Sequence, residues 1–225
     1  TRMAGSIDTA FYSGINMADI TLSLDRQYDD SWQGYVEGDR IKGDVGFKID
    51  KDARWVKPRL SYLELNKAEK ETTPSPPQDP RRFPAVDMVV EDMSFHNMKL
   101  GKVMLQGEPT TEDWELQIMK LDRPDMKVTA KGNWKSTGGN HVSSFDVDFT
   151  STDMETTLVA LDYNIDFESE LFRTTGKVSW PGAPYEYELG ILGGDLRVHS
   201  GKGRLSGVEV GAGRLLGVFN VESLR

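Results

Sequence analysis

Apolar and polar residues alternate one by one along most of this chain. Between residues 18 and 24, for example, Ala18, Ile20, Leu22 and Leu24 are separated by single polar residues. Successive side chains of a β-strand point to opposite faces, so a period of two predicts strands with one apolar and one polar face. The same alternation recurs in the segments 45–49, 114–118, 126–134, 145–149 and 185–191. The chain is therefore predicted to be mainly β, with roughly a dozen or more strands in an antiparallel meander.

Two segments depart from this pattern. Thr152 and Glu155 have the spacing of a capping box, with Thr152 as the N-cap, and the apolar residues after them recur at helical spacing. This predicts one short helix over residues 153–163. Five of the ten prolines fall in residues 72–84, which predicts an extended loop. Because strand patterns stand on both sides of this loop, we expect residues 1–225 to form one continuous β segment.

Composition excludes several classes of function. The chain has 27 Lys and Arg against 36 Asp and Glu, a net charge of −9. Binding to nucleic acid needs a basic face, so no nucleic-acid partner is expected. There is no cysteine, which excludes disulfides and thiolate chemistry. No apolar run approaches the roughly 18–20 residues of a membrane helix, so any membrane anchor is expected to lie outside these residues.

The residues that usually carry catalysis are few and scattered. His96, His141 and His199 lie far apart in the sequence. Asp146 and Asp148 share one face of a predicted strand, which favours a solvated charged face over a cation site. The glycine-rich segments near the C-terminal end lack the spacing of a phosphate-binding loop, and no hydrolase or metalloprotease signature is present. We therefore expect no enzyme, no metal and no cofactor.

The apolar faces of so many strands need a partner. Nine Met, nine Phe, seven Tyr and five Trp are present, and little helix is available to cover them. A sheet of this size must close on itself, pair with a second sheet or curl around something apolar. Composition alone favours the closed sandwich or barrel.

An ordered series of short motifs follows the predicted helix. The motifs are GKVSWPGAP at 176–184, LGILGGDL at 189–196, GKG at 201–203 and GAGRLLGVFN at 211–220. This series resembles the C-terminal region of the AsmA-like family, most closely its YhdP branch. Segments 83–87, 100–105, 114–116 and 130–134 also fit, so the resemblance covers roughly residues 83–221. Residues 1–71 match only in their strand pattern, and we expect the chain to be an excerpt of a longer protein.

The resemblance implies a fold and a function. Family members are envelope proteins of Gram-negative bacteria, with an inner-membrane helix and a long periplasmic body. That body is a repeating β-groove, a curled antiparallel sheet with an apolar interior. The resemblance thus implies a periplasmic segment, anchored to the inner membrane elsewhere, that carries phospholipid acyl chains between the inner and outer membranes. It supplies no catalytic residue.

The alternation suggests which side chains would line such a groove. We expect them among the apolar residues of the best-patterned strands. These are Val45, Phe47, Ile49, Trp114, Leu116, Ile118, Met126, Val128, Phe145, Val147, Phe149, Tyr187 and Leu189. The simpler alternative is that several of them pack beneath the short helix as ordinary core.

Two other functions fit the same strands. One is a closed structural or assembly module of the envelope that binds a protein partner and has a filled core. The other is a carbohydrate-binding sandwich, for which Trp32, Trp55 and Trp180 are candidates. Each of these tryptophans is more simply explained as a core or rim residue.

Overall fold

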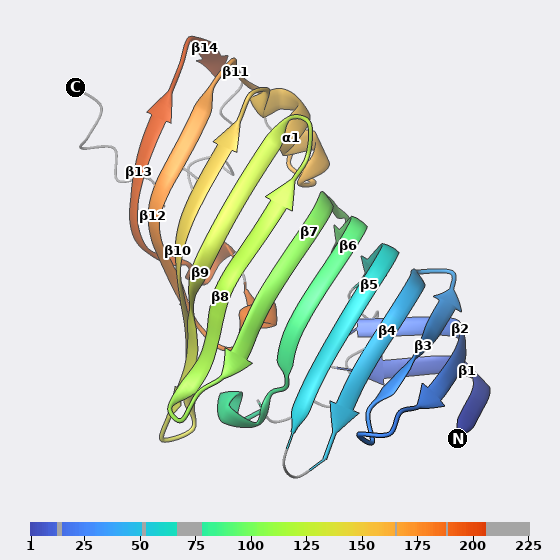
Figure 1. Ribbon diagram of the computed structural model, residues 1–225. Helices are drawn as coiled ribbons and strands as arrows, with labels where there is room; N and C mark the ends of the chain where they lie inside the picture. The colour runs from blue at the N-terminus through green and yellow to red at the C-terminus, as the bar shows by residue number, and fades with distance from the viewer. Residues whose placement is uncertain (13–14, 51–52, 67–77, 165, 188, 206–225) are drawn as a thin grey trace.

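The chain forms one large, open β-sheet. The computed structural model describes residues 1–12, 15–50, 53–66, 78–164, 166–187 and 189–205. Twelve strands hydrogen-bond in the order β1 to β10, then β12 and β13 (Figure 1). They are β1 (Arg2–Tyr12), β2 (Ile15–Arg26), β3 (Trp32–Gly38), β4 (Ile41–Ile49), β5 (Arg54–Leu65), β6 (Ala85–Phe95), β7 (Met98–Pro109), β8 (Asp113–Asp122), β9 (Met126–Thr137), β10 (Asn140–Ser151), β12 (Phe172–Pro181) and β13 (Gly193–Ser200). The predicted mainly β fold is confirmed.

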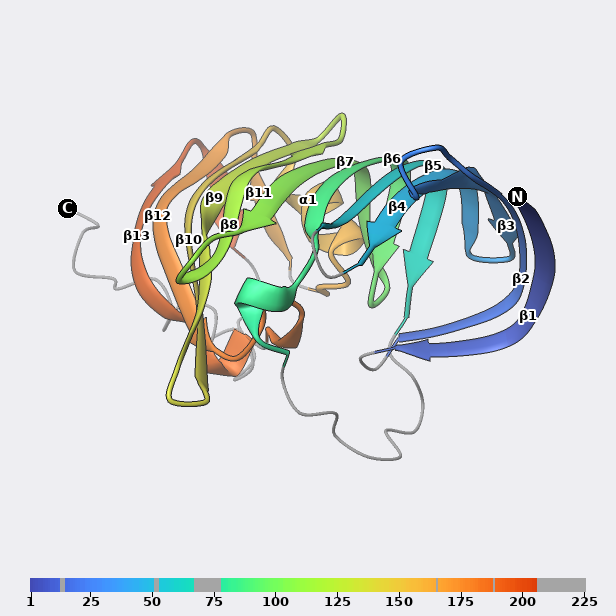
Figure 2. The same ribbon diagram turned by 60° about the horizontal axis from the view of Figure 1, so that its bottom comes forward.

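The sheet does not close into a barrel. Among the described strands, β1 pairs only with β2 and β13 only with β12. Figure 2 shows the sheet bent into an arch, with β1 and β13 on its two flanks. The closed sandwich or barrel favoured by composition is therefore wrong. Residue counts report how much apolar surface must be covered, but they do not specify strand pairing.

One neighbouring pair differs from the predicted antiparallel meander. β5 and β6 run parallel, with Leu60 opposite Val90, whereas every other neighbouring pair in the twelve-stranded sheet is antiparallel. A parallel pair cannot be joined by a tight turn, because the chain must return to the same end of the sheet. The proline-rich loop lies in this return connection. Residues 67–77 are outside the described part of the chain.

The described end of this connection packs against the sheet. It contains the short 3₁₀ helix η1 (Pro80–Arg82), which Asp79 caps by accepting a hydrogen bond from the Arg81 N–H at 3.1 Å. Phe83 follows, with its ring 5.8 Å from that of Trp114 and 5.7 Å from that of Trp134, both in edge contact. The second half of the predicted loop is thus ordered by aromatic packing.

The predicted helix is present but shorter than expected. α1 spans Met154–Ala160, not 153–163, and its N-cap is Asp153 rather than Thr152. The Asp153 carboxylate accepts hydrogen bonds from the Thr156 hydroxyl and N–H, which hold the pKa of Asp153 below its usual value. Asp is as good an N-cap as Thr or better, so the start moves by one residue. Asp162 has a φ of 63°, a conformation that ends the helical path.

The segment 185–191 is not the predicted strand. It contains two 3₁₀ helices, η2 (Pro184–Glu186) and η3 (Leu189–Ile191). Pro184 begins the first of these, and proline provides no N–H for a strand ladder. The remaining elements are the short strands β11 (Phe167–Ser169) and β14 (Gly203–Leu205), which pair with each other.

Candidate functional site

A single row of facing residues crosses all twelve strands of the large sheet. Each member is the cross-strand partner of the next, and nearly all are apolar or glycine. The row is Gly5, Leu22, Val36, Gly43, Leu60, Val90, Val103, Leu121, Val128, Phe149, Thr174 and Val198. Facing residues lie on the same side of a sheet, so one continuous apolar face extends from one edge of the sheet to the other.

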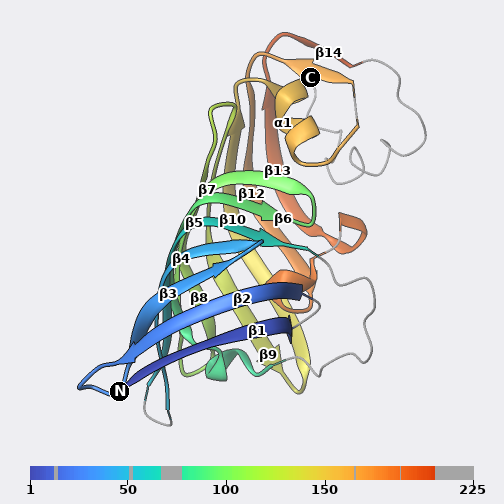
Figure 3. The same cartoon turned by 90° about the vertical axis from the view of Figure 1, so that its right-hand side faces the viewer.

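This apolar face lies on the concave side of the arch. α1, η1 and η2 all lie inside the arch (Figures 2 and 3). Phe83, next to η1, and Tyr185, within η2, pack on the buried side chains Trp114 and Trp134 of the apolar face. The elements inside the arch therefore contact the same side of the sheet that carries the apolar row.

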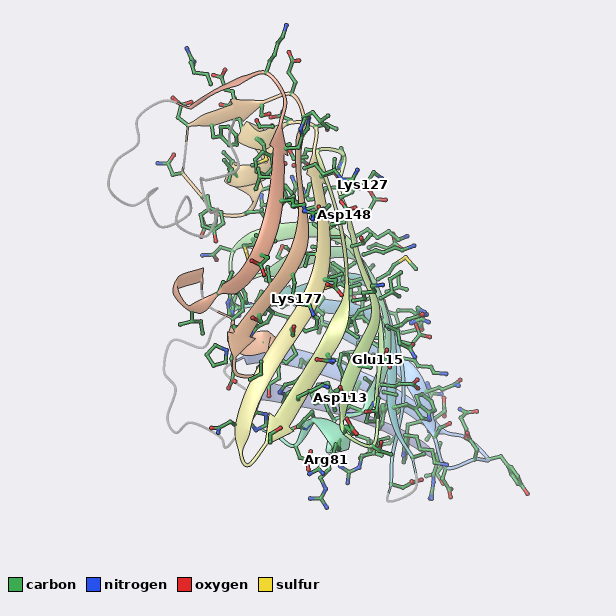
Figure 4. All side chains as sticks on the ribbon, turned by 90° about the vertical axis from the view of Figure 1, so that its left-hand side faces the viewer. Arg81, Asp113, Glu115, Lys127, Asp148 and Lys177 are labelled. Atoms are coloured by element: carbon green, nitrogen blue, oxygen red, sulfur yellow. The ribbon has the colours of Figure 1, made fainter. Side chains whose placement is uncertain are left out.

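The convex side carries charge. Figure 4 shows Glu115, Lys127, Asp148 and Lys177 on the outer surface. Asp148 pairs with Arg173 across β10 and β12 at 2.6 Å, which raises the Arg173 pKa above its usual value. Charged side chains keep the convex face hydrated and discourage its association with other molecules.

The concave side chains gather in three clusters. The first lies on β2 to β7 and includes Leu60, Val90 and Val103. The second lies on β8 to β12 and is built around Trp134, which is 1% exposed. The third surrounds α1, where Met154 and Leu158 pack on Phe172. Together they take up much of the face.

Most of the predicted groove residues belong to the concave face. Val45, Phe47 and Ile49 occupy every second position of β4 and all lie on the concave side, where Ile49 is 67% exposed. Trp114, Leu116, Met126, Phe145 and Val147 join the face on β8 to β10. Val128 and Phe149 are members of the row itself. The structure thus brings residues from distant parts of the chain onto one surface.

Ile118 is on the convex side instead. The register of β8 shifts after Leu116, so that Ile118 faces Gln106 while Met119 faces Leu105 and Ala130. A bulge adds one residue to one strand, which moves every later side chain to the opposite face. Strict alternation therefore misassigned Ile118 and missed Met119.

The predicted residues differ in how they are covered. Trp114, Leu116 and Phe145 are at most 6% exposed and form packed core in the second cluster rather than beneath α1, where Phe149 packs. Met126 is 2% exposed. Val128 and Phe47 are half-buried and lie outside the three clusters, as does the exposed Ile49, so these three are candidates for contact with a ligand.

Tyr187 reaches the concave face without belonging to a strand. It directly follows η2, and its hydroxyl donates a hydrogen bond to the Met98 sulfur at 3.4 Å. Burial raises its pKa above the usual value, and the nearby Tyr163 raises it further. Leu189 begins η3, but its side chain is outside the described part of the chain.

Several concave residues were missed by the sequence reading. In two pairs, both residues face inward although they are three positions apart in the sequence. The pairs are Leu60 with Leu63, and Val90 with Met93. A register shift between the two members of each pair produces that spacing. A step of three between apolar residues inside an alternating segment is the signal that marks such a bulge.

The three candidate sugar-binding tryptophans do not form one exposed surface. Trp32 faces Phe47 on the concave side. Trp55 lies on the opposite face, where the Lys57 ammonium sits 5.0 Å from its ring centre. Trp180 is 9% exposed and donates to the Ala183 carbonyl at 3.0 Å.

The described residues also provide no metal site. They contain no group of three or more His, Asp or Glu side chains that could hold a metal ion. Asp146 faces Lys131 on one side and Lys177 on the other, so its setting is that of a charged outer surface. Within the described part of the chain, no helix is both long enough and apolar enough to cross a membrane.

Comparison with known proteins identifies a family for this chain. A family model described as YhdP protein matches residues 1–225. No curated protein and no solved structure matches the chain. The family match confirms the resemblance inferred from the motifs, and it also covers residues 1–71, where only the strand pattern was similar. The chain therefore belongs to the YhdP family.

Proposed function

We propose that this chain is a segment of an envelope bridge that carries phospholipid between the inner and outer membranes of a Gram-negative bacterium. Acyl chains would lie on the concave face, and headgroups would remain in water at the open side of the arch. Membership of an AsmA-like family of envelope proteins supports this proposal. The function concerns a surface rather than a catalytic centre.

The observation that carries the proposal is the apolar row through all twelve strands. With strands about 4.8 Å apart, the row extends on the order of 50 Å. One leaflet of a bilayer contributes about half of its roughly 30 Å hydrocarbon core. The concave face is therefore longer than a single acyl chain, as a path along which a lipid moves would need to be.

The chemistry of the row also suits a moving ligand. Contact between apolar groups is non-directional and stabilises burial by about 25 cal/mol per Å². Within the row, the only hydroxyl is that of Thr174, which is buried and has no hydrogen-bond partner among the described residues. A surface with so few polar anchors retains acyl chains without fixing them at one position.

The test compares two substitutions at neighbouring positions of β9. Val128→Asp places a carboxylate on the concave face, where it would have to be desolvated against acyl chains. Thr129→Asp places the same group on the exposed convex face, between Lys120 of β8 and Asp148 of β10. We expect native mass spectrometry with lipid extraction to find bound phospholipid in the wild-type chain and in Thr129→Asp, and much less in Val128→Asp.

Circular dichroism would establish that both variants are folded. Val147→Asp, on the neighbouring strand β10, should behave like Val128→Asp because Val147 also faces inward. A folded wild-type chain that takes up no phospholipid, even after incubation with liposomes, would contradict the proposal and favour a structural envelope module that binds a protein.

A further inference from the structure

A short segment after β12 folds back beneath the arch and covers part of the apolar face. We call this segment, Gly182–Tyr187, the strap. Its first residues are firmly held: Gly182 N–H donates to the His141 carbonyl at 2.9 Å and Gly182 carbonyl accepts from Ser143 at 2.9 Å. Trp180 donates to the Ala183 carbonyl at 3.0 Å, and Ala183 is fully buried. This end of the strap is part of the sheet's own hydrogen-bond network.

The other end of the strap makes weaker contacts. Tyr187 reaches the hairpin between β6 and β7, where it meets Met98 and Phe95. Its hydroxyl bonds to the Met98 sulfur, a weak acceptor, and its ring centre lies 6.2 Å from that of Phe95 in a tilted arrangement. Local opening begins where few strong contacts hold a segment. Tyr187 is therefore the point at which the strap would first separate from the sheet.

The strap covers aromatic side chains of the concave face, the surface on which the proposed function places acyl chains. The Tyr185 ring lies 6.1 Å from Trp134, and the Tyr187 ring lies 6.5 Å from Trp180. Trp134 and Phe145 are 1% and 6% exposed in the same cluster. The apolar groups of the strap thus occupy a stretch of the concave face where acyl chains would otherwise lie.

We infer that the strap is a gate, which occupies the apolar face over β9 to β12 and moves away at Tyr187 when an acyl chain binds there. This inference rests on the proposed function, because it regulates the same surface. The strap and the lipid compete for one set of aromatic contacts. Lipid uptake is then reduced by the fraction of molecules in which the strap is closed.

The absence of native cysteine allows a direct test. In the double variant Met98→Cys/Tyr187→Cys, a short bis-maleimide joins the strap to the hairpin after the chain has folded. A linker is needed because the contact joins the tips of two long side chains, and a direct disulfide requires Cα atoms about 4.4–6.8 Å apart. The same variant capped with N-ethylmaleimide provides the unlinked state.

Lipid uptake is measured from phosphatidylethanolamine–phosphatidylglycerol vesicles that contain an NBD-labelled phospholipid. We expect the linked protein to bind at least about threefold less labelled lipid than the capped protein. The control pair Lys131→Cys/Asp146→Cys faces across β9 and β10 on the convex side, and linking it should leave uptake unchanged. Equal uptake by linked and capped Met98→Cys/Tyr187→Cys would overturn the gate.

A single substitution tests whether weakening the strap raises lipid uptake. Tyr187→Ala removes the tip of the strap and should raise uptake above that of the wild type, whereas Tyr35→Ala, on the convex side of β3, should not. If the wild type takes up lipid and Tyr187→Ala takes up the same amount, the gate would be overturned, whereas the proposed function would stand. No uptake by the wild type, the capped variant or Tyr187→Ala would overturn both.

Discussion

At the scale of single residues, glycines make the concave face possible. Gly132 faces Leu116 and Phe145, and a Cβ there would lie 2.1 Å from the Ser144 carbonyl oxygen. Its φ of 156° is also a conformation that side chains rarely adopt. Gly176, with a φ of 149°, sits in the same way beside Asp195. Glycine at such positions lets neighbouring strands approach closely and bend, while large apolar residues fill the space beside them.

Replacing Gly132 by alanine tests this role. The new methyl group meets backbone atoms of β10, which cannot move aside as a flexible side chain can. We expect Gly132→Ala to lower the free energy of unfolding by about 1–3 kcal/mol. Gly5→Ala, in β1, is the matched control, since nothing lies within 4 Å of a Cβ there, and it should change stability by less than about 0.5 kcal/mol. Urea unfolding measures both; equal stabilities would contradict this account.

At the scale of elements, a buried polar network attaches α1 to the sheet. Thr157, fully buried, donates to Asp125 Oδ2 at 2.9 Å and shares a hydrogen bond with the Ser151 hydroxyl at 2.9 Å. Arg123 Nε donates to Asp125 Oδ1 at 3.0 Å. Apolar packing of Met154 on this side of the helix would not by itself select one orientation, whereas hydrogen bonds are directional. The network therefore fixes how α1 sits at one end of the concave face.

Thr157→Val should loosen this attachment without changing the shape of the side chain. The substitution leaves an oxygen of Asp125 without its donor in a buried position, which costs about 1–3 kcal/mol. Thr156→Val makes the same change one residue earlier, at an exposed position, and should cost less. Thr156→Val removes only an exposed hydrogen bond to the Asp153 carboxylate, so hydrogen exchange of the α1 amides should accelerate more in Thr157→Val than in Thr156→Val. Similar exchange in the two variants would show that the network does not hold the helix.

At the scale of the whole molecule, the parallel pair β5 and β6 joins two antiparallel halves. Arg59 on β5 bonds both to the Asp87 backbone carbonyl on β6 and, at 2.8 Å, to its carboxylate. The Arg59 hydrogen bond holds the Asp87 pKa below its usual value. This interaction spans the one place where the sheet departs from its antiparallel pattern.

The lowered Asp87 pKa predicts a dependence of stability on pH. A lowered folded-state pKa contributes stability above the unfolded-state pKa of about 3.9, and this contribution is lost as the pH falls through the folded-state value. The carboxylate is partly exposed, so we expect Asp87→Asn to cost about 0.5–1 kcal/mol at pH 7. In urea unfolding, the stabilities of wild type and Asp87→Asn should converge as the pH falls below the unfolded-state pKa and through the lower folded-state value. Asp122→Asn, which removes an exposed pair with Lys127, is the control and should change stability less. A wild-type advantage over Asp87→Asn that persists in acid would argue against the stabilising role of the Arg59–Asp87 pair.

The sequence by itself determined that this chain is built of strands and that most have one apolar face. Alternation is a local property, so Val45, Val128 and Phe149 could be assigned to one surface before their strands were paired. The motifs of the C-terminal third were sufficient to indicate the family. The helix near residue 154 was likewise encoded locally, by its capping residues and apolar spacing.

Only the tertiary structure decided how these strands combine. The register shifts that turn Ile118 outward and Met119 inward depend on the neighbouring strands β7 and β9. The parallel pairing of β5 and β6, the open edges at β1 and β13, and the return of Tyr187 to Met98 all join residues far apart in the chain. Hydrophobic patterning states which side of a strand must be covered, but long-range pairing and packing select what covers it.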